Sequence, residues 1–272
     1  MLDTLLHGGI KSTEVFITNL LSLLFVIFCT MPVHEAAHAF VAHKLGDNTA
    51  KYQGRLTLNP IRHINYIGAL LILLFGFGWA EPVPVNQWNL KKPKRDMALI
   101  AAAGPLSNII MAIILLFVVN IIDVTAGLCG ISIEYVLNQG NLEIVYTGAS
   151  EFIITALGFL IDFLNYAALI NIGLAGFNLI PFPPLDGSRI FGAFLPDKIY
   201  YKLQSLERYA FFILIALSMT GVLSNVFGFI GEYIFIAVYF FTSLPFYLLG
   251  LNMPLQDYKT LIGVIKNGQA VV

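Results

Sequence analysis

The sequence predicts an all-α polytopic membrane protein, with about five to six transmembrane helices and a re-entrant or short β segment between the first and second spans. Hydrophobic residues make up 58% of the 272 residues and charged residues only 11%, whereas soluble domains carry about 25% charged residues. A helix needs about 20 apolar residues to cross a bilayer, and apolar runs of about this length recur along the chain. They cover roughly residues 15–42, 64–80, 97–122, 152–182, 209–231 and 233–252. We expect one integral-membrane domain over residues 1–272, with a core of about 15–195 and C-terminal helices within 209–252.

The first apolar run ends in the pattern His34-Glu35-Ala36-Ala37-His38, and no charged residue precedes it back to Glu14. Residues four apart share one face of a helix, so both imidazoles can bind one metal ion while Glu35 reaches its bound water. Ionisable groups at membrane depth are costly, and their presence therefore indicates function. The spacing predicts the site of a zinc hydrolase, and Pro32 is expected to kink the helix just before it.

The second apolar run, residues 64–80, is short, and basic residues flank both of its ends. They are Lys44, Lys51, Arg55 and Arg62 before it, and Lys91, Lys92, Lys94 and Arg95 after it. Basic flanks stay on the cytoplasmic side of a membrane, so both ends are expected on that side and the run is predicted to be re-entrant. An ordinary short span is the alternative.

The remaining loops extend this topology. Residues 123–150 contain acidic residues but no Lys or Arg and are expected outside, whereas residues 187–208 and the C-terminal tail are basic and are expected inside. This gives five spans and places the His pair near the cytoplasmic side. Residues 49–58 alternate in polarity and are expected to form a strand, whose exposed edge could pair with an extended substrate near Gly54.

A catalytic zinc site usually takes three protein ligands, so a third is required beside the His pair. Asp186 is the best candidate, because it follows the proline-rich residues 181–184 at the cytoplasmic end of an apolar run. Broken backbone at membrane depth is tolerated where it lines a wet cavity. His43 lies five residues beyond His38 and points away from it, and His63 is expected at the surface. Glu81 is an alternative ligand, although the prolines next to it indicate a loop. The alternative for Asp186 is a simple helix-ending turn.

Taken together, these motifs resemble the site-2 proteases, a family of intramembrane zinc metalloproteases. The resemblance rests on residues 34–38, on Ala103-Gly104-Pro105-Leu106-Ser107-Asn108, and on the stretch from Asn178 to Gly187. Residues 54–60 and 78–86 also look like the compact prokaryotic branch of the family, which lacks an added PDZ or CBS domain. The resemblance covers about residues 30–195.

The resemblance implies one Zn²⁺ per chain, held by His34, His38 and Asp186, with Glu35 as the general base. It implies an endopeptidase that hydrolyses peptide bonds in or near transmembrane segments, for regulated intramembrane proteolysis or for clearing signal-peptide remnants. The expected partners are a membrane-protein substrate and the lipid bilayer. The expected location is the prokaryotic cell membrane. A net charge of −1 gives no indication of nucleic-acid binding.

Three further residues, Asn178, Asn108 and Gly54, are candidates for substrate binding or for holding the oxyanion. Close helix packing is the competing explanation for Asn178, and also for Asn108, which shares a small-residue face with Gly104 and Ala112. A catalytically inactive metal-binding scaffold or chaperone is the alternative function, although such a protein has no use for Glu35. A di-iron oxidase would need a second Glu-x-x-His pattern, which the sequence lacks.

Overall fold

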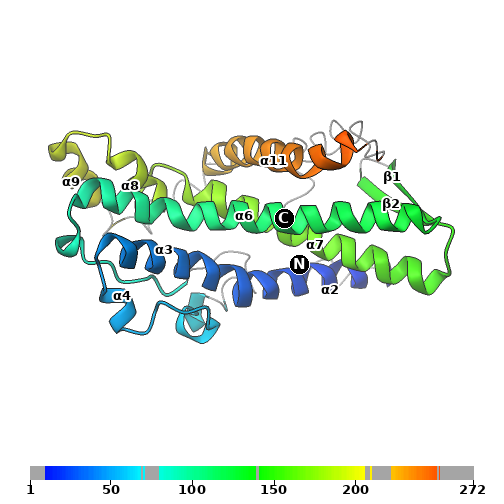
Figure 1. The fold of residues 1–272 in the computed structure, drawn as a ribbon, viewed down its shortest axis with the longest axis horizontal. Coiled ribbons are helices and arrows are strands. Elements are labelled where there is room, and N and C mark those ends of the chain that lie inside the picture. Colours follow the sequence, from blue (N-terminus) through cyan, green and yellow to red (C-terminus); the bar gives the residue numbers. More distant parts are fainter. Residues whose placement is uncertain are drawn as a thin grey trace. The chain divides into compact units, whose positions relative to one another are not determined.

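The computed structural model of the protein describes residues 10–68, 70, 80–138, 141–205, 209, 222–249 and 251. These residues are mostly helical (Figure 1). The described residues include four helical stretches that are long and apolar enough to cross a membrane, which confirms the prediction of a helical membrane protein. They are Phe16–Leu45, Pro93–Leu128, Glu151–Asn178 and Gly228–Leu248. Most of the predicted run 209–231 lies outside the described residues, so the total of five to six spans stays a prediction.

The helix that carries the His-Glu-x-x-His pattern changes its winding just before the pattern begins. It starts as α2 (Ile10–Phe25), passes through one π-helical turn, η1 (Val26–Thr30), and continues as α3 (Met31–Leu45). The N–H of Met31 donates to the carbonyl of Val26, five residues back. Pro32 has no N–H and its ring crowds the preceding turn, which a wider turn relieves. The distortion expected at Pro32 is therefore a π-helical turn, a feature often found at functional sites.

The strand predicted for residues 49–58 is wrong. Thr49–Tyr52 forms a helical turn, α4, and the described residues 53–68 contain turns and a 3₁₀ turn, η2 (Pro60–Arg62), but no strand. Gly54 closes a turn onto Lys51 with a φ of +69°, a left-handed conformation that favours glycine. Ala50 is the only buried residue among 49–58, so the alternation of polarity in this segment does not mark a half-buried strand.

His63 is buried rather than at the surface, with 1% of its area exposed. Its Nε2 lies 2.8 Å from the carbonyl oxygen of Thr57, so the ring holds the turn of residues 57–63 together. The re-entrant run predicted for residues 64–80 falls largely on residues 69 and 71–79, outside the described residues, and it stays a prediction.

An extended segment, residues 80–90, leads to the next long helix and is called the strap below. Residues 80–86 are irregular and are followed by a 3₁₀ turn, η3 (Gln87–Asn89). At its end Leu90 is buried against Ala42 of α3 and against Met97 and Ile100 of α6 (Pro93–Leu128). The apolar contact fixes the end of the strap to both helices.

A β-hairpin occupies the segment predicted only as an outside loop. Strand β1 (Ser132–Asn138) pairs antiparallel with β2 (Asn141–Thr147) (Figure 1). The register places Ser132 opposite Thr147. Alternating apolar residues such as Ile133, Tyr135 and Leu137 are the signal that sequence analysis missed.

The third long helix, α7 (Glu151–Asn178), ends three residues before Pro181, as expected for a proline-rich break. Two short helices follow it, α8 (Asp186–Gly192) and α9 (Asp197–Ser205). The last described helix, α11 (Val222–Leu248), runs through Glu232 without a break, so the predicted boundary between runs 209–231 and 233–252 is wrong. Continuing the helix keeps backbone groups paired, and ending it in lipid would leave them unpaired.

The chain divides into two compact units. One comprises the described residues of 1–22, 112–169 and 232–272, and the other those of 23–111 and 170–231. Within the first unit, Asn120 of α6 is buried and its Nδ2 donates to the Thr242 carbonyl of α11 at 2.9 Å. The second unit holds His34, Glu35, His38 and Asp186, the centre of the candidate site described below. The prediction of a single domain stays a prediction.

Candidate metal and catalytic site

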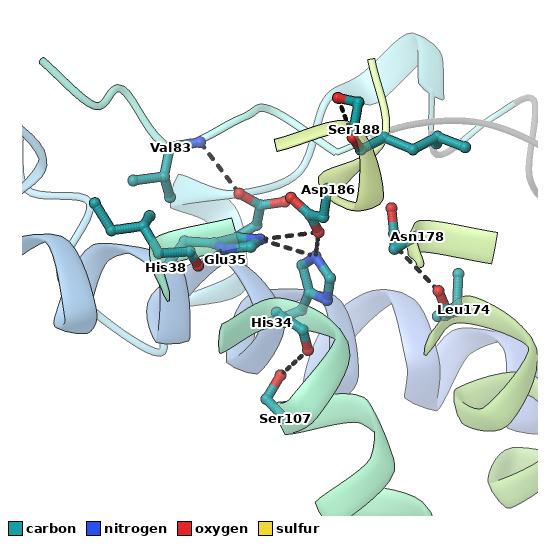
Figure 2. A network of polar contacts seen from close by, with 12 residues as sticks. His34, Glu35, His38, Val83, Ser107, Leu174, Asn178, Asp186 and Ser188 are labelled. Carbon is teal, nitrogen blue, oxygen red and sulfur yellow. Dashed lines mark hydrogen bonds and ion pairs between the residues drawn. The ribbon is translucent and has the colours of Figure 1, made fainter. Parts of the chain in front are cut away.

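Three side chains from two distant helices converge on one point in the second unit. His34 and His38 come from α3, and Asp186 is the first residue of α8. The two Nε2 atoms lie 3.1 Å apart, and each lies 3.4 Å from Oδ2 of Asp186 (Figure 2). These three residues form a group of ligand atoms that could hold a metal ion.

The tautomer of His38 follows from its contact with the neighbouring helix. Its Nδ1 lies 2.7 Å from the carbonyl oxygen of Ile100 in α6. A carbonyl can only accept, so Nδ1 carries the proton and Nε2 presents its lone pair to the other two groups. A backbone carbonyl that orients a ligand histidine in this way is typical of metal sites.

The donor set fits a zinc ion. Zinc in proteins takes imidazole nitrogen and carboxylate oxygen ligands in a tetrahedral arrangement, which spaces neighbouring ligand atoms about 3.3–3.4 Å apart. The observed separations of 3.1 to 3.4 Å match that spacing. Burial alone would raise the pKa of Asp186, but the two neighbouring imidazoles outweigh it and hold that pKa well below the usual range. The carboxylate is therefore ionised, which is the form that binds metal.

Gly104 explains how α6 approaches the two imidazoles so closely. A Cβ built on this glycine would lie 2.5 Å from Cε1 and Nε2 of His34 and would also overlap Nε2 of His38. Only a residue without a side chain fits there. Asn108 and Ala112, one and two turns further along the same face, are buried, with 1% and 0% of their areas exposed. The expected small-residue contact face is therefore present, and its first member touches the site.

Glu35 lies between the two histidines in sequence, and its carboxylate is held by the strap. The backbone N–H of Val83 donates to Oε2 of Glu35 at 3.1 Å, and Figure 2 shows both beside Asp186. Sequence reasoning found Glu35 but missed Val83 and Ile100, because both act through backbone atoms that any residue could supply. The arrangement brings the Glu35 carboxylate close to the three side chains that could hold a metal ion.

The other candidate residues have contacts of their own. Nδ2 of Asn178 donates to the Leu174 carbonyl of the same helix at 3.0 Å (Figure 2). Asn108 is fully buried, and neither polar atom of its side chain has a hydrogen-bond partner among the described residues. Gly54 belongs to the turn after α4. Among the described residues, no hydrogen bond or ion pair joins these three residues to His34, His38 or Asp186.

Comparison with known proteins identifies the chain. The sequence model of peptidase family M50 matches residues 22–223, which include every residue of the site. The chain belongs to this family. Over 198 residues, 73% of this chain, it is 37% identical to YwhC of Bacillus subtilis and covers 80% of that protein. It is also 28% identical to MJ0392 of Methanocaldococcus jannaschii over 193 residues, which cover 71% of this chain and 39% of that protein.

A third relative is Rip2 of Mycolicibacterium smegmatis, 26% identical over 71% of this chain and 64% of its own length. All three relatives carry "zinc metalloprotease" in their names. No solved structure matches the chain significantly. Family membership confirms the resemblance to site-2 proteases, and with it the predictions of a zinc metalloprotease and of zinc as its metal. Together with the four apolar helices, it makes the chain a multi-pass membrane protein.

Proposed function

We propose that this M50 metalloprotease is an endopeptidase that cleaves other membrane proteins in or near their transmembrane segments. The observation that carries the proposal is that Asp186 of α8 meets His34 and His38 beside Glu35. The last three residues lie in the helical stretch Phe16–Leu45, which is apolar enough to span a membrane. A site built at the end of such a helix suits a substrate that is itself in the bilayer. Regulated intramembrane proteolysis and clearance of signal-peptide remnants both need this reaction.

The roles follow from the positions of the side chains. His34, His38 and Asp186 would hold the zinc ion, which when bound supplies a Lewis acid that activates water near neutral pH and polarises the scissile carbonyl. Glu35 accepts a proton from the attacking water and passes it to the nitrogen of the leaving amine. The Val83 N–H holds Oε2 of Glu35 and so fixes the orientation of the carboxylate. One C–O bond forms, the C–N bond breaks, and the water proton ends on the new amine.

The active site is proposed to face the cytoplasmic side of the membrane. The support is the basic character of the segments next to it, with Lys44 at the end of α3 and Lys91 and Lys92 beyond the strap. Single cysteines placed at Lys44 and at the exposed Thr147 should react from opposite sides with a membrane-impermeant maleimide. Labelling of both from the same side would contradict this orientation.

Asn178 and Asn108 remain the candidates for contacts to the substrate, and Gly54 is the weakest of the three. One hydrogen of the Asn178 amide is used within its own helix, which leaves the second for an oxyanion. The buried, unpaired amide of Asn108 is costly to keep unless a substrate or a water satisfies it. If these residues bind substrate, Asn178→Ala and Asn108→Ala should retain zinc and lose cleavage.

The proposal is tested with Glu35→Gln, which removes the base and leaves all three metal ligands in place. Membrane proteomes of cells that produce the wild-type protein or the variant are compared for fragments that appear only with the wild type. The zinc content of both purified proteins should be equal. Asp197→Asn makes the same type of change on an exposed carboxylate of the same unit and serves as the control that should cleave normally. Unchanged fragments with Glu35→Gln would refute the mechanism.

A further inference from the structure

Asp47 is a fully buried carboxylate that no part of the proposed mechanism uses. It lies two residues after α3, and 0% of its area is exposed. Four donors surround it. The N–H and the hydroxyl of Thr49 donate to Oδ1 at 3.0 and 2.5 Å. The side chain of Asn89 donates to Oδ1 at 2.8 Å, and the N–H of Asn86 donates to Oδ2 at 2.7 Å.

Two of these donors belong to the strap, so Asp47 ties the strap to the end of the metal-binding helix. All the hydrogen-bond partners of Asp47 are donors. An ionised carboxylate can pair with all of them, because both of its oxygens are acceptors. An asparagine would place an NH₂ group against one of these donors. A buried charge needs such partners to be tolerated, and here the partners include the segment that reaches Glu35.

The stretch between Asp47 and Glu35 is short and stiff. Val83, which donates to Glu35, lies three residues before Asn86, a distance of at most about 11 Å along an extended chain. Pro82 and Pro84 enclose Val83, and their rings fix two of the backbone angles around it. A displacement of the strap at Asn86 should therefore move the Val83 N–H by a similar distance.

The other end of the strap is held separately. The N–H of Glu81 donates to the His63 carbonyl at 2.8 Å, and the Glu81 carboxylate accepts from Asn65 at 3.1 Å. Arg55 lies 3.8 Å from the same carboxylate. Contacts at Glu81 and at Asp47 thus hold the strap on either side of Val83, and the second contact carries the buried charge.

We infer that Asp47 is a positioning residue for the peptidase reaction, acting through the strap to hold the Val83 N–H on the Glu35 carboxylate. The inference rests on the proposed function of Glu35. A displacement of about 1 Å at a catalytic group can cost about 100-fold in rate. Loss of the Asp47 contacts should therefore lower kcat by about 10- to 100-fold, with zinc content and KM unchanged.

The experiment uses the full-length protein in detergent with zinc bound, and a dye-labelled single-span peptide that the wild type cleaves. Hydrogen–deuterium exchange over residues 82–90 is measured on the same samples. Asp47→Asn should speed exchange in this segment and lower kcat. Asn89→Ala, which removes a single strap donor and leaves the carboxylate paired, should show the same changes to a smaller extent. Asp197→Asn is the matched carboxylate control and should change neither the hydrogen–deuterium exchange of residues 82–90 nor kcat.

A double-mutant cycle then separates positioning from general destabilisation. Val83→Pro removes the N–H that contacts Glu35. If Asp47 acts through this contact, Asp47→Asn should lower kcat much less in the Val83→Pro background than in the wild type. Unchanged strap exchange in both Asp47→Asn and Asn89→Ala, or effects of Asp47→Asn and Val83→Pro that multiply independently, would overturn the inference. Retained cleavage by Glu35→Gln would instead refute the proposed function, and the exchange measurement still tests the link between Asp47 and the strap.

Discussion

Replacing Gly104 with alanine should weaken zinc binding, because the new methyl group would occupy the space of the His34 imidazole. The Cβ would lie 2.5 Å from Cε1 and Nε2 of His34, whereas non-bonded carbon atoms rest about 3.5–4.0 Å apart. The ring or the helix must therefore move by about 1 Å. Metal–ligand distances tolerate only about 0.2 Å, so the ligand geometry cannot survive unchanged.

The expected size of the effect follows from two measures. Overpacking a tight site costs about 1–3 kcal/mol, which corresponds to roughly 5- to 150-fold in an equilibrium constant. Disturbing groups next to a metal ligand typically costs about 10- to 100-fold in affinity. We expect Gly104→Ala to bind zinc about 10- to 100-fold more weakly than the wild type.

The assay is a competition for zinc between the purified protein and a chelating dye, with thermal unfolding recorded in parallel. Gly127→Ala is the matched control, because it lies in the same helix and a Cβ there meets nothing within 4 Å. Alanine is a better helix former than glycine by about 1 kcal/mol. Helix propensity alone therefore predicts that both variants are more stable than the wild type. Zinc affinity of Gly104→Ala equal to that of the wild type would show that α6 does not press on the ligands.

Two further outcomes concern stability. Hydrogen bonds from Thr49, Asn89 and Asn86 outweigh burial and hold the pKa of Asp47 below its ordinary value of 3.8. The ionised carboxylate therefore stabilises the fold above pH 3.8, and this stabilisation is lost as the pH falls through the lowered pKa. The melting temperature of the wild type should therefore exceed that of Asp47→Asn at neutral pH, and the difference should shrink below about pH 4; a constant difference would contradict this. Asn120→Leu removes the hydrogen bond to Thr242 and should cost about 0.6 kcal/mol of unfolding free energy, as such bonds between membrane helices do; a loss of several kcal/mol would contradict it.

Local spacing accounts for the parts of the site that could be predicted. The i, i+4 relation of His34 and His38 places their rings on one helix face, and this needs no knowledge of the rest of the fold. The proline-rich break before Asp186 was equally visible, as was the apolar length of the main helices. The strand at residues 49–58 failed for the opposite reason, since short turns and a half-buried strand produce the same alternation of polarity.

By itself, the sequence determined that the chain lies in a membrane, that one of its helices carries two histidines spaced to share a metal ion, and that Glu35 lies between them. Only the tertiary structure decided that Asp186 meets that pair, that Gly104 must lack a side chain, and that backbone groups of Ile100 and Val83 orient His38 and Glu35. The physical reason is that periodicity orders neighbours along a helix, whereas contacts between segments far apart in sequence depend on how their surfaces pack. Backbone N–H and C=O groups are the same in nearly every residue, so the sequence does not show which of them will contact a site. Only the folded structure shows it.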